Sequence, residues 1–204
     1  MRAGAGGARV LTLGAITSNS QALWYLTRGF GLVALVLLSL TMVMGLLQVV
    51  RFAQPGLPRF VIAGLHRNVS LLAMALLAVH ILTAVVDSYV PIRLADVFVP
   101  FVSRYRPLWL GLGALSVDLL VAVAVTSLVR ERLGHRAWRI IHWSAYACWP
   151  LAVAHGLGIG TDTGLGWVVF INIGCIAAVV GALSWRLAWG WSTANAARKR
   201  IDAA

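Results

Sequence analysis

Charged side chains are scarce in this sequence, and acidic ones are the scarcest. Charged residues make up 11% of the 204 residues, with only six Asp and Glu, whereas a soluble domain has about 25%. Cysteine is nearly absent too, because only Cys148 and Cys175 are present, in separate apolar runs and without a CxxC pair. These shortages exclude an ordinary soluble domain and a disulfide framework.

Apolar residues dominate what is present. They form 60% of the chain, and the mean hydropathy is +0.86. The formal net charge is +11, but the arginines stand between apolar runs, which is how charge flanks membrane spans. We therefore predict a multi-pass protein of the cell membrane, surrounded by membrane lipid, with no nucleic-acid partner.

Five apolar runs are long enough to cross a bilayer, which takes about 20 residues. They cover about 26–50, 60–86, 108–129, 137–158 and 165–187. We expect an all-α integral membrane protein, a bundle of about five transmembrane helices. Its parts are an N-terminal lead-in (1–23), the membrane domain (24–188) and a basic cytoplasmic tail (189–204).

Flanking positive charge predicts the orientation, because cytoplasmic loops are enriched in Lys and Arg. One set of flanks carries ten Lys and Arg residues, and the other carries six. The side with ten is expected in the cytoplasm, which places the N-terminus outside and the C-terminus inside. The second and fourth runs then both cross from inside to outside.

Those two runs carry two histidines each. His66 and His80 are fourteen residues apart, which in an α-helix is about 21 Å and about 40° short of four full turns. Both rings are therefore expected on one face. His142 and His155 are thirteen residues apart, a spacing roughly 140° short of four turns. A bend at Pro150 is expected to bring these two rings back toward one partner helix.

The topology pairs His66 with His142 near the cytoplasmic side, and His80 with His155 near the outer side. Histidines are rare inside membrane helices and are usually functional there. Zinc favours a tight tetrahedral cluster, which residues about 21 Å apart along a helix do not form. Two histidines that face each other suit the two axial positions of a haem iron.

The spacing H-x13-H on one helix and H-x12-H two helices later resembles the ferric reductase-like transmembrane domain. That superfamily includes ferric reductases, the membrane half of the NADPH oxidases and the haem subunit of bacterial methionine sulfoxide reductase systems. The segment Trp138-Arg139-Ile140-Ile141-His142-Trp143-Ser144-Ala145-Tyr146 is similar to its Trp-x-x-x-His-x-x-x-Tyr pattern, and Leu65-His66-Arg67 also resembles the family. The resemblance covers about residues 24–188 and suggests a bacterial stand-alone membrane domain.

The resemblance implies two stacked b-type haems enclosed by the bundle, with His66, His142, His80 and His155 as the iron ligands. Many family members continue into flavin and nicotinamide domains, but here only residues 189–204 follow the last run. A nucleotide-binding βαβ unit needs about 30 residues. We therefore expect no FAD or NADPH site in this chain, and a separate flavoprotein or a quinol as the electron donor.

Two arginines and two further titratable residues complete the candidate set. Arg28 opens the first run, where the family has an arginine; its guanidinium suits the propionates of the outer haem, and contact with lipid head groups is the alternative. Arg67 has the same two interpretations at the inner haem. Asp118, near mid-membrane, is interpreted as structural, with a hydrogen bond to a haem ligand as the alternative. His135, in the basic loop, is interpreted as solvated.

The predicted function is a transmembrane dihaem cytochrome b that relays electrons one at a time to an acceptor on the outer face. It is expected to be an oxidoreductase component that needs a separate donor. The acceptor stays open between ferric iron, oxygen and an extracytoplasmic redox protein. Two alternatives are a quinol-oxidising cytochrome b subunit of a redox complex, and a non-enzymatic helical membrane protein whose histidines are only packed.

Overall fold

The computed structural model describes the backbone of residues 5–49, 59–87, 90–160 and 163–202, and the side chains of residues 21–49, 60–87, 90–160 and 163–192. Over these ranges the chain forms helices and connecting loops, without a β-strand. The helices are α1 (Ala5–Val49), α2 (Arg59–Val86), α3 (Leu94–Phe98), α4 (Pro107–Leu128), α5 (Arg130–Leu133), α6 (His135–His142), α7 (Ala145–Ile159) and α8 (Gly166–Asp202).

Four of the described helices are long and apolar enough to cross a membrane. Their apolar stretches are Gln21–Val49, Phe60–Val86, Pro107–Leu128 and Gly166–Ser192. These correspond to the first, second, third and fifth runs of the sequence. The all-helical fold is therefore confirmed for the described residues.

The fourth run differs from the single span expected over 137–158. It consists of α6 and α7, which are separated at Trp143 and Ser144. Here backbone bonds close over three residues, from Ser144 N to Ile141 O (2.9 Å) and from Tyr146 N to Trp143 O (3.0 Å). This is a 3₁₀-type turn. The helix continues through Pro150, so the break lies near His142 and not at the proline.

The lead-in and the tail are continuous with the long helices that they flank. α1 begins at Ala5, so residue 23 lies inside that helix. α8 likewise extends past residue 189 to Asp202. Residues 1–4 and 203–204 lie outside the described part.

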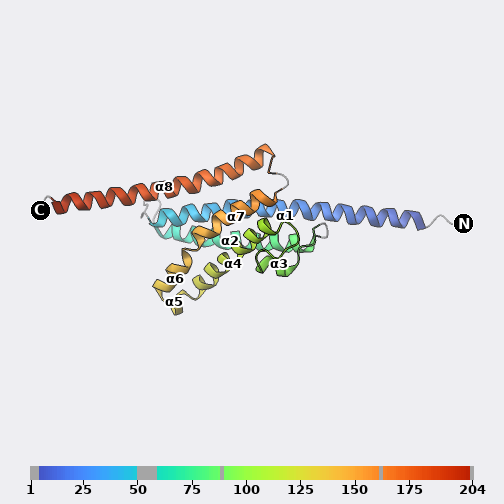
Figure 1. The fold of residues 1–204 in the computed structure, drawn as a ribbon, viewed down its shortest axis with the longest axis horizontal. Coiled ribbons are helices and arrows are strands. Elements are labelled where there is room, and N and C mark those ends of the chain that lie inside the picture. Colours follow the sequence, from blue (N-terminus) through green and yellow to red (C-terminus); the bar gives the residue numbers. More distant parts are fainter. Residues whose placement is uncertain (1–4, 50–58, 88–89, 161–162, 203–204) are drawn as a thin grey trace.

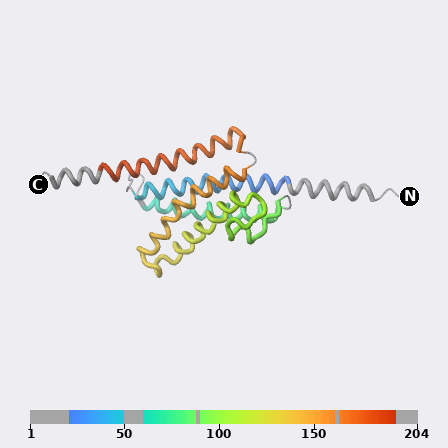
Figure 2. The backbone as a smooth tube through the Cα atoms, in the orientation of Figure 1, coloured from blue at the N-terminus to red at the C-terminus, as the bar shows by residue number. Residues whose placement is uncertain are grey.

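Helix α1 is central to the bundle, because α2, α7 and α8 each contact it (Figure 1). The tube view shows α1 and α2 side by side (Figure 2). α4 contacts α7, and also α3 near one end of the bundle and α5 and α6 near the other. We call these the α3 end and the α5–α6 end.

Local sequence fixes where two of these helices begin. Pro107 starts α4 with its preset backbone angle, and Gly134, at φ 78°, separates α5 from α6.

The core lies where α1, α7 and α8 meet. Its buried members are Leu35 and Met42 of α1, Trp149 and Val153 of α7, and Val179 of α8. The indole N–H of Trp149 donates to Ser39 Oγ at 2.8 Å, and both residues are buried. This bond satisfies a polar group that would otherwise lie unpaired in an apolar interior.

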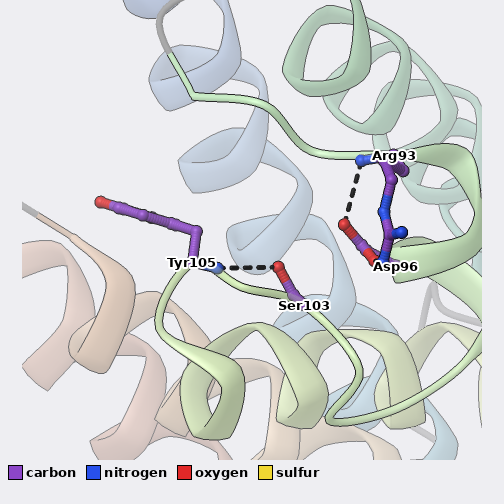
Figure 3. Close-up of polar contacts among 4 residues, drawn as sticks. All are labelled: Arg93, Asp96, Ser103 and Tyr105. Carbon is purple, nitrogen blue, oxygen red and sulfur yellow. Dashed lines mark hydrogen bonds and ion pairs between the residues drawn. The ribbon is translucent and has the colours of Figure 1, made fainter.

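The short helix α3 is fixed by an ion pair (Figure 3). The backbone N–H and the guanidinium of Arg93 donate to the Asp96 carboxylate at 3.0 and 2.8 Å. These bonds hold the pKa of the Asp96 carboxyl below its usual value, because they favour the ionised form. Farther along, Ser103 Oγ accepts a hydrogen bond from the backbone N–H of Tyr105. The loop then returns over α4, where Phe101 contacts the backbone at Gly111.

Candidate functional site

The first histidine pair lies at the α5–α6 end. His66 of α2 and His142 at the end of α6 have ring centroids 6.5 Å apart, with the ring planes at 59°. Both side chains are half-buried. The structure thus brings together the two residues that the topology predicted as one pair.

The second pair lies around a cavity at the α3 end. His80 of α2 and His155 of α7 both line this cavity, whose volume is about 180 Å³. A single water needs only about 10–15 Å³, so the space is far larger than a packing defect. Its wall is mainly apolar and comes from α1, α2, α4 and α7, with additions from α3 and α8. Both histidines therefore line a mainly apolar space, somewhat larger than the cavity of about 150 Å³ that binds benzene in another protein.

Three of the four rings are anchored by backbone carbonyls of a neighbouring helix. His66 Nδ1 bonds to Thr41 O (3.1 Å), His80 Nδ1 to Thr27 O (2.7 Å), and His155 Nδ1 to Trp109 O (2.8 Å). A carbonyl oxygen can only accept, so Nδ1 carries the proton in each ring. The neutral ring then leaves Nε2 with its lone pair, which is the state that binds a metal.

The fourth ring is held differently. His142 Nδ1 is buried without a hydrogen-bond partner among the described residues. Its ring stacks on Trp138, with centroids 4.9 Å apart and planes at 28°. The indole of Trp138 is fixed in turn, because its N–H donates to Ser127 Oγ at 3.2 Å. A stacked aromatic ring therefore orients His142 in place of a carbonyl.

Glycines give two of these rings their space. A Cβ on Gly113 would lie 2.5 Å from His155 Nδ1, and one on Gly31 would lie 2.9 Å from His80 Cε1. Real Cβ atoms essentially never make contacts under 3.0 Å. A Cβ on Gly45 would lie 3.4 Å from His66 Cε1, which is ordinary contact. Alanine at Gly31 or Gly113 would thus displace a ring that lines the cavity.

The two predicted arginines differ in their surroundings. Arg28 lines the cavity, and its Nη2 donates to Ile159 O at 3.4 Å, near the end of α7. Arg106, which the sequence did not single out, donates to Gly158 O at 2.8 Å. Both cations are placed to interact favourably with the carbonyl end of α7. Arg67 is exposed on α2 beside His66.

Three further observations concern Asp118, the number of possible metal ligands and His135. Asp118 is half-buried on α4, and no hydrogen bond joins it to another described residue. Within the described ranges, His, Cys, Asp and Glu form no group of three or more that could hold a metal. A metal held by either histidine pair would therefore have two protein ligands. His135 is exposed, as predicted, but it lies at the start of α6 and not in a loop.

Some of the site could not be read from the sequence. The carbonyl partners of His66, His80 and His155 belong to helices distant in the chain, and no residue type marks a carbonyl. Trp138 did carry a signal, because it precedes His142 by four residues, which puts both side chains on one helix face.

These helices define an all-helical protein in which four described helices are long and apolar enough to cross a membrane. Residues 22–162 match the family described as a domain of unknown function, DUF8596, and the chain belongs to that family. The matched region runs from α1 to just beyond α7 and contains all four paired histidines. No curated protein and no solved structure matches the sequence.

Proposed function

We propose that this protein is a transmembrane dihaem cytochrome b of the ferric reductase-like type, which relays electrons one at a time across the membrane. The observation that carries the proposal is the pairing of four histidines, with one pair at the α5–α6 end and one around the cavity at the α3 end. Each pair takes one residue from α2 and one from the α6–α7 segment.

The spacing of the first pair supports a single metal ion between its rings. An imidazole nitrogen lies about 1 Å from its ring centroid, and a metal–nitrogen bond is about 2 Å. Two rings on opposite sides of one ion therefore have centroids about 6 Å apart. The observed separation of His66 and His142 is 6.5 Å.

The hydrogen bonds support the same role. Thr27, Thr41 and Trp109 each hold a ring through Nδ1, and such outer partners orient a metal-ligating histidine. When bound, haem iron would supply the one-electron chemistry. The protein would contribute the histidines that hold the iron, their orientation and an apolar sheath that excludes water.

The apolar wall of the cavity favours an organic group over a bare ion at the second pair. Its wall is mainly apolar, and Gly31 and Gly113 keep the space beside His80 and His155 open. Arg28 lines the same cavity and is placed to pair with a carboxylate of such a group. The acceptor would then be reduced at the α3 end, which the distribution of Lys and Arg predicts to be the outer side. A separate flavoprotein or a quinol would supply electrons at the α5–α6 end.

Haem content of purified variants tests the proposal. We expect two b-type haems per unsubstituted chain by pyridine haemochrome assay. His66→Ala and His142→Ala should each remove one haem, and His80→Ala and His155→Ala should each remove the other. Loss of one haem per variant, with distinct spectra left by the two groups, would show two independent sites.

His135→Ala is the matched control. This histidine is exposed and belongs to neither pair, so its variant should keep both haems. The proposal is wrong if replacing His80 and His155 leaves haem content unchanged, or if His135→Ala lowers it as much as the paired substitutions do.

A further inference from the structure

A row of neighbouring rings leads from the surface to the first histidine pair. The exposed ring of His135 lies 5.5 Å from the ring of Trp138, measured between centroids. Trp138 lies 4.9 Å from His142, which lies 6.5 Å from His66. The row therefore joins the surface of the α5–α6 end to the His66–His142 pair through ring contacts alone.

Positive charge surrounds the exposed end of this row. Arg130, Arg132, Arg136 and Arg139 of α5 and α6 are all exposed, and none forms an ion pair with another described side chain. Glu131 is the one acidic residue in these two helices. We call these four arginines the basic corner; Figure 1 shows α5 and α6 together beyond the end of α4.

We infer that the basic corner is the docking surface for an acidic redox protein, which delivers electrons over the rings of His135 and Trp138. The inference rests on the proposed function and names the kind of donor partner. Exposed arginines of one sign attract a partner of the opposite sign and raise its association rate by about 10 to 1000-fold. Anionic lipid could meet the same arginines, but lipid binding would not require a ring row that reaches the surface beside them.

The binding experiment needs no haem. The full chain would be placed in nanodiscs of zwitterionic lipid, and an acidic flavodoxin would serve as the probe. We expect Kd to rise at least tenfold when salt is raised from 50 to 500 mM, because screening weakens exposed charge pairs. The triple variant R132Q/R136Q/R139Q should raise Kd about tenfold at low salt. Arg104→Gln, which removes one exposed arginine near the α3 end, should change Kd less than twofold.

A kinetic readout separates docking from the ring row. Trp138→Leu should leave the Kd for flavodoxin unchanged but slow haem reduction by photoreduced flavodoxin at least tenfold. Trp138→Phe, which keeps an aromatic ring, should restore most of the rate. Haem content, measured on every variant, shows whether His142 still ligates.

Two results would overturn the inference. One is a triple variant that binds flavodoxin like the unsubstituted chain; if that variant also loses binding to anionic vesicles, the corner is a lipid contact. The other is equal reduction rates for Trp138→Leu and the unsubstituted protein. A chain that binds flavodoxin at the corner but contains no haem would instead refute the proposed function.

Discussion

Alanine at Gly113 should selectively damage the site at the α3 end. The added Cβ would lie 2.5 Å from His155 Nδ1 and 2.7 Å from Cε1. Ordinary contact begins at 3.4 Å, so the ring must retreat by about 0.9 Å. Metal–ligand distances tolerate only about ±0.2 Å, and the retreat also strains the bond from His155 Nδ1 to Trp109 O, now 2.8 Å.

The size of the expected haem loss follows from the hydrogen bond between His155 Nδ1 and Trp109 O. Loss of an outer hydrogen bond to a metal-ligating histidine typically lowers metal affinity by about 10 to 100-fold. We therefore expect Gly113→Ala to purify with about one haem per chain, or with a second haem that is lost during gel filtration. The haem at the His66–His142 pair should be unaffected, because Gly113 lies beside His155 in the wall of the cavity at the α3 end.

Pyridine haemochrome analysis and a redox titration would measure the effect. Gly64→Ala is the control, since a Cβ there would meet nothing within 4 Å, and alanine favours a helix by about 1 kcal/mol over glycine. Far-UV circular dichroism would show that both variants are folded. Two haems with unchanged midpoint potentials in Gly113→Ala would refute the reasoning.

Three further predictions concern the fold and its orientation. The Arg93–Asp96 pair should stabilise α3 fully at pH values above the ordinary carboxyl pKa of 3.8, and this stabilisation should be lost as pH falls through the lowered pKa of Asp96. Hydrogen exchange of residues 93–99 should become faster over that pH range. Asp96→Asn should abolish the pH dependence. Ser39→Ala removes the acceptor for the Trp149 indole and should lower stability in detergent by about 0.6 kcal/mol, with about 1.7 kcal/mol as the upper bound; a larger loss by chemical unfolding would mean that the bond does more than join two helices. Reporter fusions should place the C-terminus and the basic corner in the cytoplasm, and a periplasmic reporter signal from either would reverse the assigned orientation.

Much of the helical layout is predictable because membrane spans depend on apolar length. The run over 60–86 corresponds to α2 (Arg59–Val86), and the run over 108–129 to α4 (Pro107–Leu128). Histidine pairing also followed from topology and depth, since His66 and His142 do lie together. These inferences needed only residue type and spacing.

The break after His142 was not predictable from the same signals. Neither Trp143 nor Ser144 is a strong helix breaker, whereas Pro150 is, so the bend was expected at the proline. A 3₁₀-type turn advances about 120° per residue instead of about 100°. Three or four such residues add roughly 60–80° of rotation. This recovers about half of the 140° by which the His142–His155 spacing falls short of four full helical turns. The contacts that orient the rings depend on tertiary packing, and a single sequence does not encode them locally.

Haem stoichiometry of the unsubstituted protein is the most direct test of the central claim. The full chain would be expressed with haem precursor supplied, purified in detergent and assayed by pyridine haemochrome and dithionite-reduced spectra. The account predicts two b-type haems per chain. Colourless protein that is folded by circular dichroism would contradict it and leave a helical bundle whose histidines are only packed.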